Sequence, residues 1–171
     1  MTFSSGPGLG LIAAFLVLLI DQITKWWVIS VMTPPREIVI TPFFNLVMVW
    51  NRGISFGLFN NGGANAWFLS AVALAIVVFL GIWLLKTGGR LLPGGLGLVI
   101  GGALGNVIDR VFREPRAVAD FLDFHWTGYH WPAFNVADAA ITVGAAILVY
   151  DSLFMGAEKH KNGSLDHEKN D

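Results

Sequence analysis

Long apolar runs constrain the fold of this chain more than any other feature. The clearest run covers residues 66–85, contains no charged residue and ends at Lys86. A helix needs about 20 residues, at roughly 1.5 Å rise each, to cross the hydrocarbon core of a bilayer, so this run can span it. Of the 171 residues, 54% are hydrophobic and only 13% are charged, which is too apolar for a soluble domain. The sequence therefore predicts an integral membrane protein.

Four such runs predict a mainly α fold, an integral membrane four-helix transmembrane bundle. The helices are expected over about 9–32, 66–86, 91–109 and 136–155. The first run shows no A-x-A-like cleavage site, and no Lys or Arg precedes it, so we expect a retained helix rather than a signal peptide. We predict a single membrane-embedded domain over residues 1–156 and a polar cytoplasmic tail over residues 157–171.

The segment between the first two runs differs from the predicted helices. Residues 37–59 are rich in β-branched and aromatic residues, and Pro42, Gly53 and Gly57 interrupt them, which favours short strands and turns. Strands inside hydrocarbon would leave backbone groups without hydrogen-bond partners. We therefore expect a small extracytoplasmic β-rich flap that rests on the membrane surface.

The residue types of the chain narrow its possible chemistry. The absence of Cys excludes disulfides, thiolate metal sites and a Cys nucleophile. A net charge of −1 gives no reason to expect a nucleic-acid partner. His125 and His130 lie among aromatic residues without an H-E-x-x-H spacing, which is more typical of a wetted loop than of a zinc site. The sequence predicts neither a metal nor a cofactor.

Polar side chains near the ends of the apolar runs are the candidates for function. An ionised Asp at the centre of a membrane helix costs about 2.5 to 3.5 kcal/mol, so such residues are usually kept for chemistry or transport. Asp21 and Lys25 lie one helical turn apart, where they can neutralise each other, and this favours a structural ion pair. Asn106, Asp109 and Arg110 share one helical face, although anchoring or a helix-end charge pair explains them equally well.

The segment 117–138 is the strongest indication of chemistry, because it places acids near one edge of the bilayer. Asp120 precedes an aromatic loop, and Asp138 lies just inside the fourth run, three residues after Asn135. If this segment is extended, Asp120 and Asp123 point to opposite sides, so only one of them can face a shared site. The residue pattern does not choose between these two acids.

Two features of the flap have competing interpretations. Asn51 precedes a glycine turn, where its side chain either caps that turn or reaches into a site, and the residue type favours the cap. Residues Gly53 to Gly57 match the G-x-S-x-G nucleophile elbow, which makes an intramembrane serine hydrolase built on Ser55 an alternative. The match is weak, because the elbow also requires a preceding strand, a following helix and a His and an acid nearby.

Five motifs in one order resemble the motif set of bacterial lipoprotein signal peptidase, also called signal peptidase II. They are DQITK (21–25), NRGIS (51–55), GGALGNVIDR (101–110), VADF (118–121) and FNVAD (134–138). The resemblance covers nearly the whole membrane part of the chain. It implies an aspartic endopeptidase of the bacterial inner membrane. Such enzymes cut prolipoproteins on the N-terminal side of a Cys that carries diacylglycerol.

The same resemblance implies roles for particular residues. Asp120 and Asp138 correspond to the catalytic pair, which selects Asp120 over Asp123. Ser55 corresponds to a small-residue position of the flap, which weakens the serine-hydrolase alternative. Prolipoproteins with a diacylglyceryl-Cys and membrane lipids are the implied partners. Supporting or substrate-binding positions correspond to Asn51, Asn106, Asp109, Arg110, Asn135, Asp21 and Lys25.

Four spans place both termini on one side of the membrane and the polar site on the other. The numbers of Lys and Arg on the two sides do not decide the orientation. Because several cations on the site side belong to the polar constellation, we place the termini in the cytoplasm and the site at the periplasmic face. A small proton- or ion-coupled transporter is the main alternative. It fits less well, because the other halves of the spans are nearly free of polar residues apart from Asp151.

Overall fold

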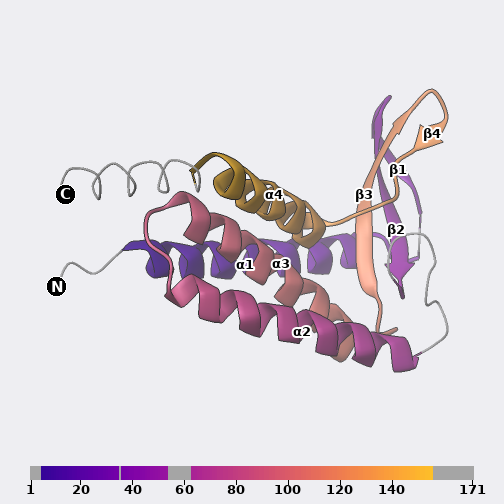
Figure 1. Ribbon diagram of the computed structural model, residues 1–171. Coiled ribbons are helices and arrows are strands. Elements are labelled where there is room, and N and C mark those ends of the chain that lie inside the picture. Colours follow the sequence, from indigo (N-terminus) through magenta and orange to yellow (C-terminus); the bar gives the residue numbers. More distant parts are fainter. Residues whose placement is uncertain (1–4, 35, 54–62, 156–171) are drawn as a thin grey trace, which may run out of the picture.

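The computed structural model describes residues 5–34, 36–53 and 63–155. Within these ranges, four long helices form a bundle and a small sheet covers one end of it (Figure 1). The predicted fold class, a mainly α four-helix bundle with a small β-rich part, is confirmed. The helices are α1 (Ser5–Val31), α2 (Gly63–Leu85), α3 (Leu91–Phe112) and α4 (Val136–Tyr150), followed by a π-helical turn, η1 (Asp151–Met155).

Helices α1, α2 and α3, and α4 together with η1, are long and apolar enough to cross a membrane. Large apolar side chains such as Phe15, Phe68 and Phe79 are exposed on the helices. Lipid tails are as apolar as these side chains, so this exposure is expected of helices that face a bilayer. The stretches are Gly6–Val31, Ala66–Leu85, Leu91–Phe112 and Val136–Phe154.

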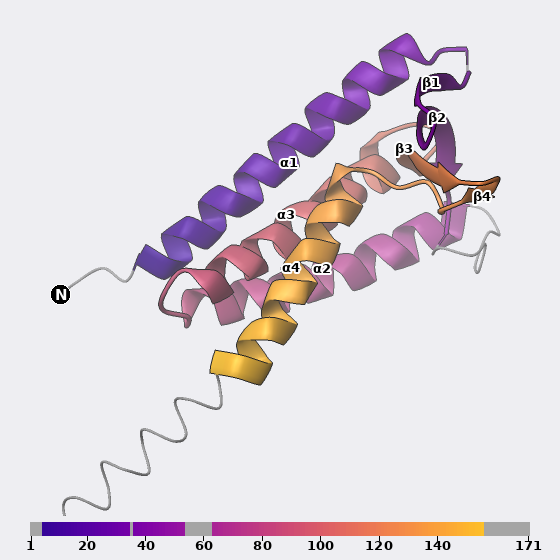
Figure 2. The same cartoon turned by 90° about the horizontal axis from the view of Figure 1, so that it is seen from above.

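Helix α3 is the centre of the bundle and packs against α1, α2 and α4 (Figure 2). Small residues make this packing possible. A Cβ atom at Gly97 or Gly101 would collide with the backbone of α1 at Gly10 or Ala14, and one at Gly144 of α4 would collide with the backbone of α3. Such close approach is how helices associate in lipid. It holds the polar ends of α1, α3 and α4 next to one another.

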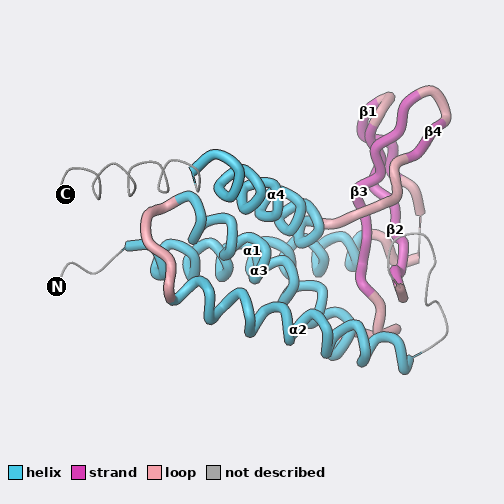
Figure 3. The backbone as a smooth tube through the Cα atoms, in the orientation of Figure 1, coloured by secondary structure: helices cyan, strands magenta, loops and turns pink. Residues whose placement is uncertain are grey.

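Two separate segments build one antiparallel sheet at the end of the bundle (Figure 3). Strands β1 (Ile38–Thr41) and β2 (Phe44–Asn51) come from the predicted flap, whose residues 54–59 lie outside the described residues, and β3 (Val118–Trp126) comes from the segment before α4. The pairing of β2 with β3, from Phe44 with Phe124 to Asn51 with Val118, joins segments far apart in the chain and was not predicted. The strands, in spatial order, are β1 (Ile38–Thr41), β2 (Phe44–Asn51), β3 (Val118–Trp126) and β4 (Tyr129–His130).

A small apolar core attaches the sheet to the bundle. Val28 of α1 and Met32, which follows α1, pack against Leu46 of β2 and Phe121 of β3. Val28 and Met32 are each 1% exposed, so their apolar surface is almost fully removed from solvent. Because Phe121 follows Asp120 in β3, this core also places Asp120 above the end of the bundle.

Candidate active site

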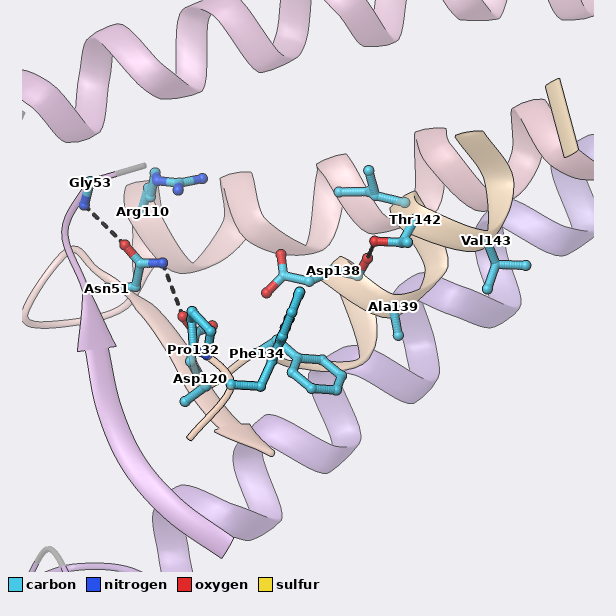
Figure 4. Close-up of a pocket in the computed structure, with 13 residues that line it drawn as sticks. Asn51, Gly53, Arg110, Asp120, Pro132, Phe134, Asp138, Ala139, Thr142 and Val143 are labelled. Atoms are coloured by element: carbon cyan, nitrogen blue, oxygen red, sulfur yellow. Dashed lines mark hydrogen bonds between the residues drawn. The ribbon is translucent and has the colours of Figure 1, made fainter. Parts of the chain in front are cut away.

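A cavity of about 700 Å³ lies where the sheet meets the bundle, and two carboxylates line it (Figure 4). Asp120 reaches the cavity from β3, and Asp138 reaches it from the first turn of α4. The other walls include the end of β2 with Asn51, the end of α3 with Arg110, and the segment 131–134. Residues that are far apart in the sequence therefore converge on one cavity.

Asn135 connects the two acids. It is the N-cap of α4, where its Oδ1 accepts the backbone N–H of Asp138 at 3.0 Å and its own N–H donates to Asp138 Oδ2 at 3.3 Å. This reciprocal capping box is typical of a cap residue followed three positions later by an acid. The Nδ2 of the same side chain donates to Asp120 Oδ1 at 2.6 Å. A fully buried amide therefore orients both carboxylates.

Asn51 holds Asp120 from the other side. Its Nδ2 donates to Asp120 Oδ2 at 3.0 Å, and its Oδ1 accepts the N–H of Gly53 at 3.1 Å. Asn51 therefore caps its own turn and also reaches into the site, so both interpretations of this residue hold. Each oxygen of Asp120 accepts one side-chain amide, which fixes the plane of the carboxylate.

Asn106 holds Asp138 and links it to a lysine. Its Nδ2 donates to Asp138 Oδ1 at 2.8 Å, and its Oδ1 accepts from Lys25 Nζ at 3.0 Å. The lysine fixes which way the Asn106 amide points, because an ammonium group can only donate. The side chains from α1, α3 and α4 therefore form one continuous chain of hydrogen bonds.

Lys25 lies at the centre of a buried ion cluster. Its Nζ is 2.9 Å from Asp21 Oδ2 and 2.9 Å from Asp109 Oδ2, and all three side chains are 0% exposed. The predicted ion pair of Asp21 and Lys25 is confirmed. Asp109 is a second carboxylate partner, and its other oxygen pairs with Arg113 rather than with Arg110.

The cluster also holds the backbone beside each acid of the cavity. Asp109 Oδ2 accepts the N–H of Ala119, the residue before Asp120, at 3.2 Å. Asp21 Oδ1 accepts the N–H of Ala137, the residue before Asp138, at 3.0 Å. Both alanines are fully buried. A membrane-embedded ion cluster therefore sets the spacing of the strand and the helix that carry the two acids.

Asp120 is poorly suited to carry a charge. Burial raises the pKa of its carboxyl, and the neighbouring charge of Asp138 raises it further, to about 7. Hydrogen bonds from Asn51 and Asn135 oppose this shift without cancelling it. Two close carboxylates in a poorly solvated site do not ionise together readily. The raised pKa of Asp120 therefore favours its protonated form up to about neutral pH.

Arg110 lines the cavity beside these acids (Figure 4). Its Nε is buried and has no hydrogen-bond partner among the residues that the structure describes. A guanidinium group carries five N–H donors and no acceptor. Arg110 can therefore donate to a carbonyl or anionic group of a molecule in the cavity.

Several sequence candidates lie elsewhere. Asp123 does not line the cavity, and its carboxylate contacts Asn45 and His130 instead. The rings of His125 and His130 stack, with centroids 4.8 Å apart. Among the described residues, no group of three His, Cys, Asp or Glu side chains could hold a metal ion. Ser55 lies outside the described residues.

Two parts of the site were not predicted from the sequence. Gln22 donates to Asp21 Oδ2 at 3.1 Å and accepts from Arg113 at 3.1 Å, so it closes the outer side of the ion cluster. Gln22 is a polar residue next to Asp21 within an apolar run, and this position could have indicated its place in the ion cluster. The segment 131–134 forms a wall of the cavity, yet Trp131 and its neighbours are ordinary interfacial residues and carry no such signal.

Known proteins resemble this chain over most of its length. The family model described as signal peptidase (SPase) II matches residues 13–154. The lipoprotein signal peptidase of Methylorubrum extorquens (strain PA1) is 48% identical over 149 residues, which cover 84% of this chain and 85% of that protein. The lipoprotein signal peptidase of Ralstonia nicotianae is 46% identical over 151 residues, which cover 86% and 84%.

A solved structure also matches the whole arrangement. A bacterial membrane enzyme structure at 2.3 Å resolution superposes with a TM-score of 0.73 at 29% identity. The match covers 85% of this chain and 90% of that one. The bundle and its sheet are therefore shared with a membrane enzyme.

Proposed function

Because the chain belongs to the signal peptidase II family, we propose that it removes signal peptides from prolipoproteins by hydrolysis between Asp120 and Asp138. Members of this family are proteases of bacterial membranes that act on lipoproteins. The cut falls on the N-terminal side of a Cys that carries diacylglycerol. The observation that carries the proposal is that both carboxylates are held by amide hydrogen bonds and face one cavity.

The reaction needs only the two acids and water. The ionised carboxylate accepts a proton from water while the water oxygen attacks the scissile carbonyl carbon. The protonated carboxyl donates its proton to the carbonyl oxygen, which gives a neutral tetrahedral intermediate. The C–N bond then breaks, the leaving amine takes a proton from the pair, and one hydroxyl of the intermediate returns a proton to the pair as the new carboxylic acid forms. The roles of acid and base are therefore assigned to the two carboxylates together and not to one residue each.

The surrounding residues support this chemistry. Asn51, Asn106 and Asn135 hold the acids in position, so that little reorganisation is needed during the reaction. Lys25, with Asp21 and Asp109, holds the backbone beside both acids. Arg110 donates to a backbone carbonyl of the bound peptide or to a lipid head group, which is consistent with its unpartnered Nε.

The position of the cavity suggests how the substrate enters. The cavity lies between the sheet and the first turns of α4, at one end of an apolar helix. Acyl chains of the substrate stay in lipid while its peptide extends beneath the sheet. We place this end at the periplasmic face and both termini in the cytoplasm, which matches the site of lipoprotein processing that the family implies.

Cleavage of a lipidated substrate is the test of this function. Purified protein in detergent is expected to cut a diacylglyceryl-modified prolipoprotein and to cut the same chain without the lipid poorly. Equal cleavage of both forms would contradict the lipid requirement, and no cleavage of either form would contradict the proposed function.

Cleavage should fall as the pH rises above about 7. The pKa of Asp120 is raised to about 7, so the shared proton is present below this pH and is lost above it. We expect kcat/KM to fall by about tenfold per pH unit on the alkaline side. The free energy of unfolding should also fall as the pH rises. The pKa of Asp120 is higher in the folded state than in the unfolded state, so this carboxyl stabilises the fold fully only below its unfolded-state pKa. That stabilisation is lost as the pH rises through about 7. A flat profile would disprove the assignment.

Two alternatives receive less support. An ion-coupled transporter would need polar groups along the whole path, whereas the buried charged side chains Asp21, Lys25 and Asp109 lie near the same end as the cavity. A serine hydrolase would need Ser55, and Ser55→Ala is expected to keep substantial turnover if the aspartate pair is catalytic. Membership of a peptidase family favours hydrolysis over transport.

A further inference from the structure

Asp123 is a buried carboxylate that the proposed reaction does not use. It lies on β3 three residues after Asp120, its residue is 5% exposed, and it does not line the cavity. His130 Nδ1 lies 2.9 Å from one of its oxygens and 3.0 Å from the other. Asn45 Nδ2 donates to it at 3.3 Å. Burying a carboxylate costs free energy unless hydrogen bonds or a charged partner compensate for the lost water.

The contacts of Asp123 connect the whole sheet. Asn45 lies directly opposite Asp123 on β2, and its Nδ2 also donates to Glu37 Oε1 at 2.8 Å, next to β1. His130 belongs to β4, and its ring stacks on that of His125 with centroids 4.8 Å apart. The polar chain from Glu37 through Asn45 and Asp123 to His130 therefore joins β1, β2, β3 and β4.

Strand β4 leads directly into a wall of the cavity. The residues that follow it, 131–134, all line the cavity beside Asp120 and Asp138. The far end of this wall is firmly attached, because Phe134 exchanges two backbone hydrogen bonds with Leu122, at 2.8 and 3.1 Å. At the near end, Trp131 N–H donates to the carbonyl of Phe124 at 2.8 Å.

The near end of the wall needs further support. Strand β4 is two residues long, and so short a strand is marginally stable by its backbone bonds alone. The side chain of His130 is 54% exposed, whereas that of Asp123 is 8% exposed. The pair therefore joins a short, exposed strand to a carboxylate buried inside the sheet.

We propose that Asp123 and His130 are positioning residues for substrate binding, because the hydrogen bond between their side chains holds β4 against the sheet and so places the 131–134 wall of the cavity. This inference rests on the proposed function of the cavity. Neither side chain touches the reacting atoms. Loss of the pair should weaken binding of the peptide, which contacts the wall, and leave the chemistry of Asp120 and Asp138 intact.

The test compares KM and kcat for a diacylglyceryl-modified prolipoprotein. His130→Phe keeps the ring that stacks on His125 and removes only the bond to Asp123. We expect KM to rise about three- to fivefold with kcat within about twofold of wild type. Asp123→Leu is expected to raise KM at least as much, because it also removes the contact with Asn45, and the double variant should raise KM no further than Asp123→Leu.

Tyr129→Phe is the matched control, since it removes one polar atom from the other residue of β4 and should leave KM unchanged. An unchanged KM in His130→Phe, additive effects in the double variant, or an equal rise in Tyr129→Phe would each overturn the inference. A fall in kcat at unchanged KM would also overturn it. Wild type is measured first, so failure of wild type to cut the substrate disproves the proposed function separately.

Discussion

Asp120→Asn and Asp138→Asn are each expected to reduce kcat for prolipoprotein cleavage by a factor on the order of 10² to 10⁴. Each change keeps the shape of the side chain and removes one carboxylate that transfers a proton. In Asp120→Asn, only Asp138 remains and the proton-holding carboxyl of the proposed reaction is missing. In Asp138→Asn, only Asp120 remains and its partner carboxylate Asp138 is missing. The measurement is single-turnover cleavage of a diacylglyceryl-modified prolipoprotein by purified protein in detergent.

Asp151→Asn is the matched control for this experiment. Asp151 lies at the far end of α4 in the turn η1, away from the cavity, so its substitution should leave kcat unchanged. Circular dichroism and thermal unfolding would show that the three variants are folded. Wild-type kcat in either Asp120→Asn or Asp138→Asn would rule out the paired-aspartate mechanism.

Lys25→Met is expected to lower the free energy of unfolding by about 3 to 5 kcal/mol. Lys25 is the cation between Asp21 and Asp109, and none of the three side chains is exposed. Without it, the buried carboxylate of Asp21 loses its charge partner, Asp109 keeps only Arg113, and the two carboxylates repel each other. This loss is a large part of the total stability of a typical protein, which is about 5 to 15 kcal/mol. Thermal unfolding in detergent measures the effect.

Two further variants show whether the loss of stability comes from breaking the ion cluster or from removing a lysine as such. Lys86→Met removes an exposed lysine that follows α2 and should change stability little. The triple variant Lys25→Met, Asp21→Asn, Asp109→Asn should be more stable than Lys25→Met alone, because a buried ion group replaced as a whole costs far less than one left incomplete. If Lys25→Met unfolds like wild type, the cluster does not hold the bundle together.

Much of the fold follows from local patterns. A run such as 66–85 is long enough and apolar enough to be a membrane helix whatever surrounds it, because the backbone must satisfy its own hydrogen bonds in lipid. Strands β1 and β2 were also predictable locally, because their segment is rich in the β-branched and aromatic residues that favour strands. The pair of Asp21 and Lys25 was predictable because helical geometry alone brings residues at i and i+4 together.

The pairing of distant segments was not predictable from such patterns. Nothing in the sequence near Asn51 indicates that β2 pairs with β3, or that its amide meets Asp120. The alternation of a strand shows only that Asp120 and Asp123 point to opposite sides. Which side faces the cavity is decided by the tertiary contacts of β3, where Asn51 and Asn135 hold Asp120. Resemblance to the family selected Asp120, and the structure supplies the geometry that puts it in the cavity.

The sequence by itself determined the class of the protein, its membrane helices and the short-range contacts, because each depends on the composition or spacing of neighbouring residues. Only the tertiary structure decided that Asp109 shares Lys25 with Asp21, that Asn135 joins Asp120 to Asp138, and that β4 leads into the cavity wall. The physical reason is that side-chain hydrogen bonds act over about 3 Å. Such contacts exist only after the close packing of α3 and the register of the sheet have set the distances between segments.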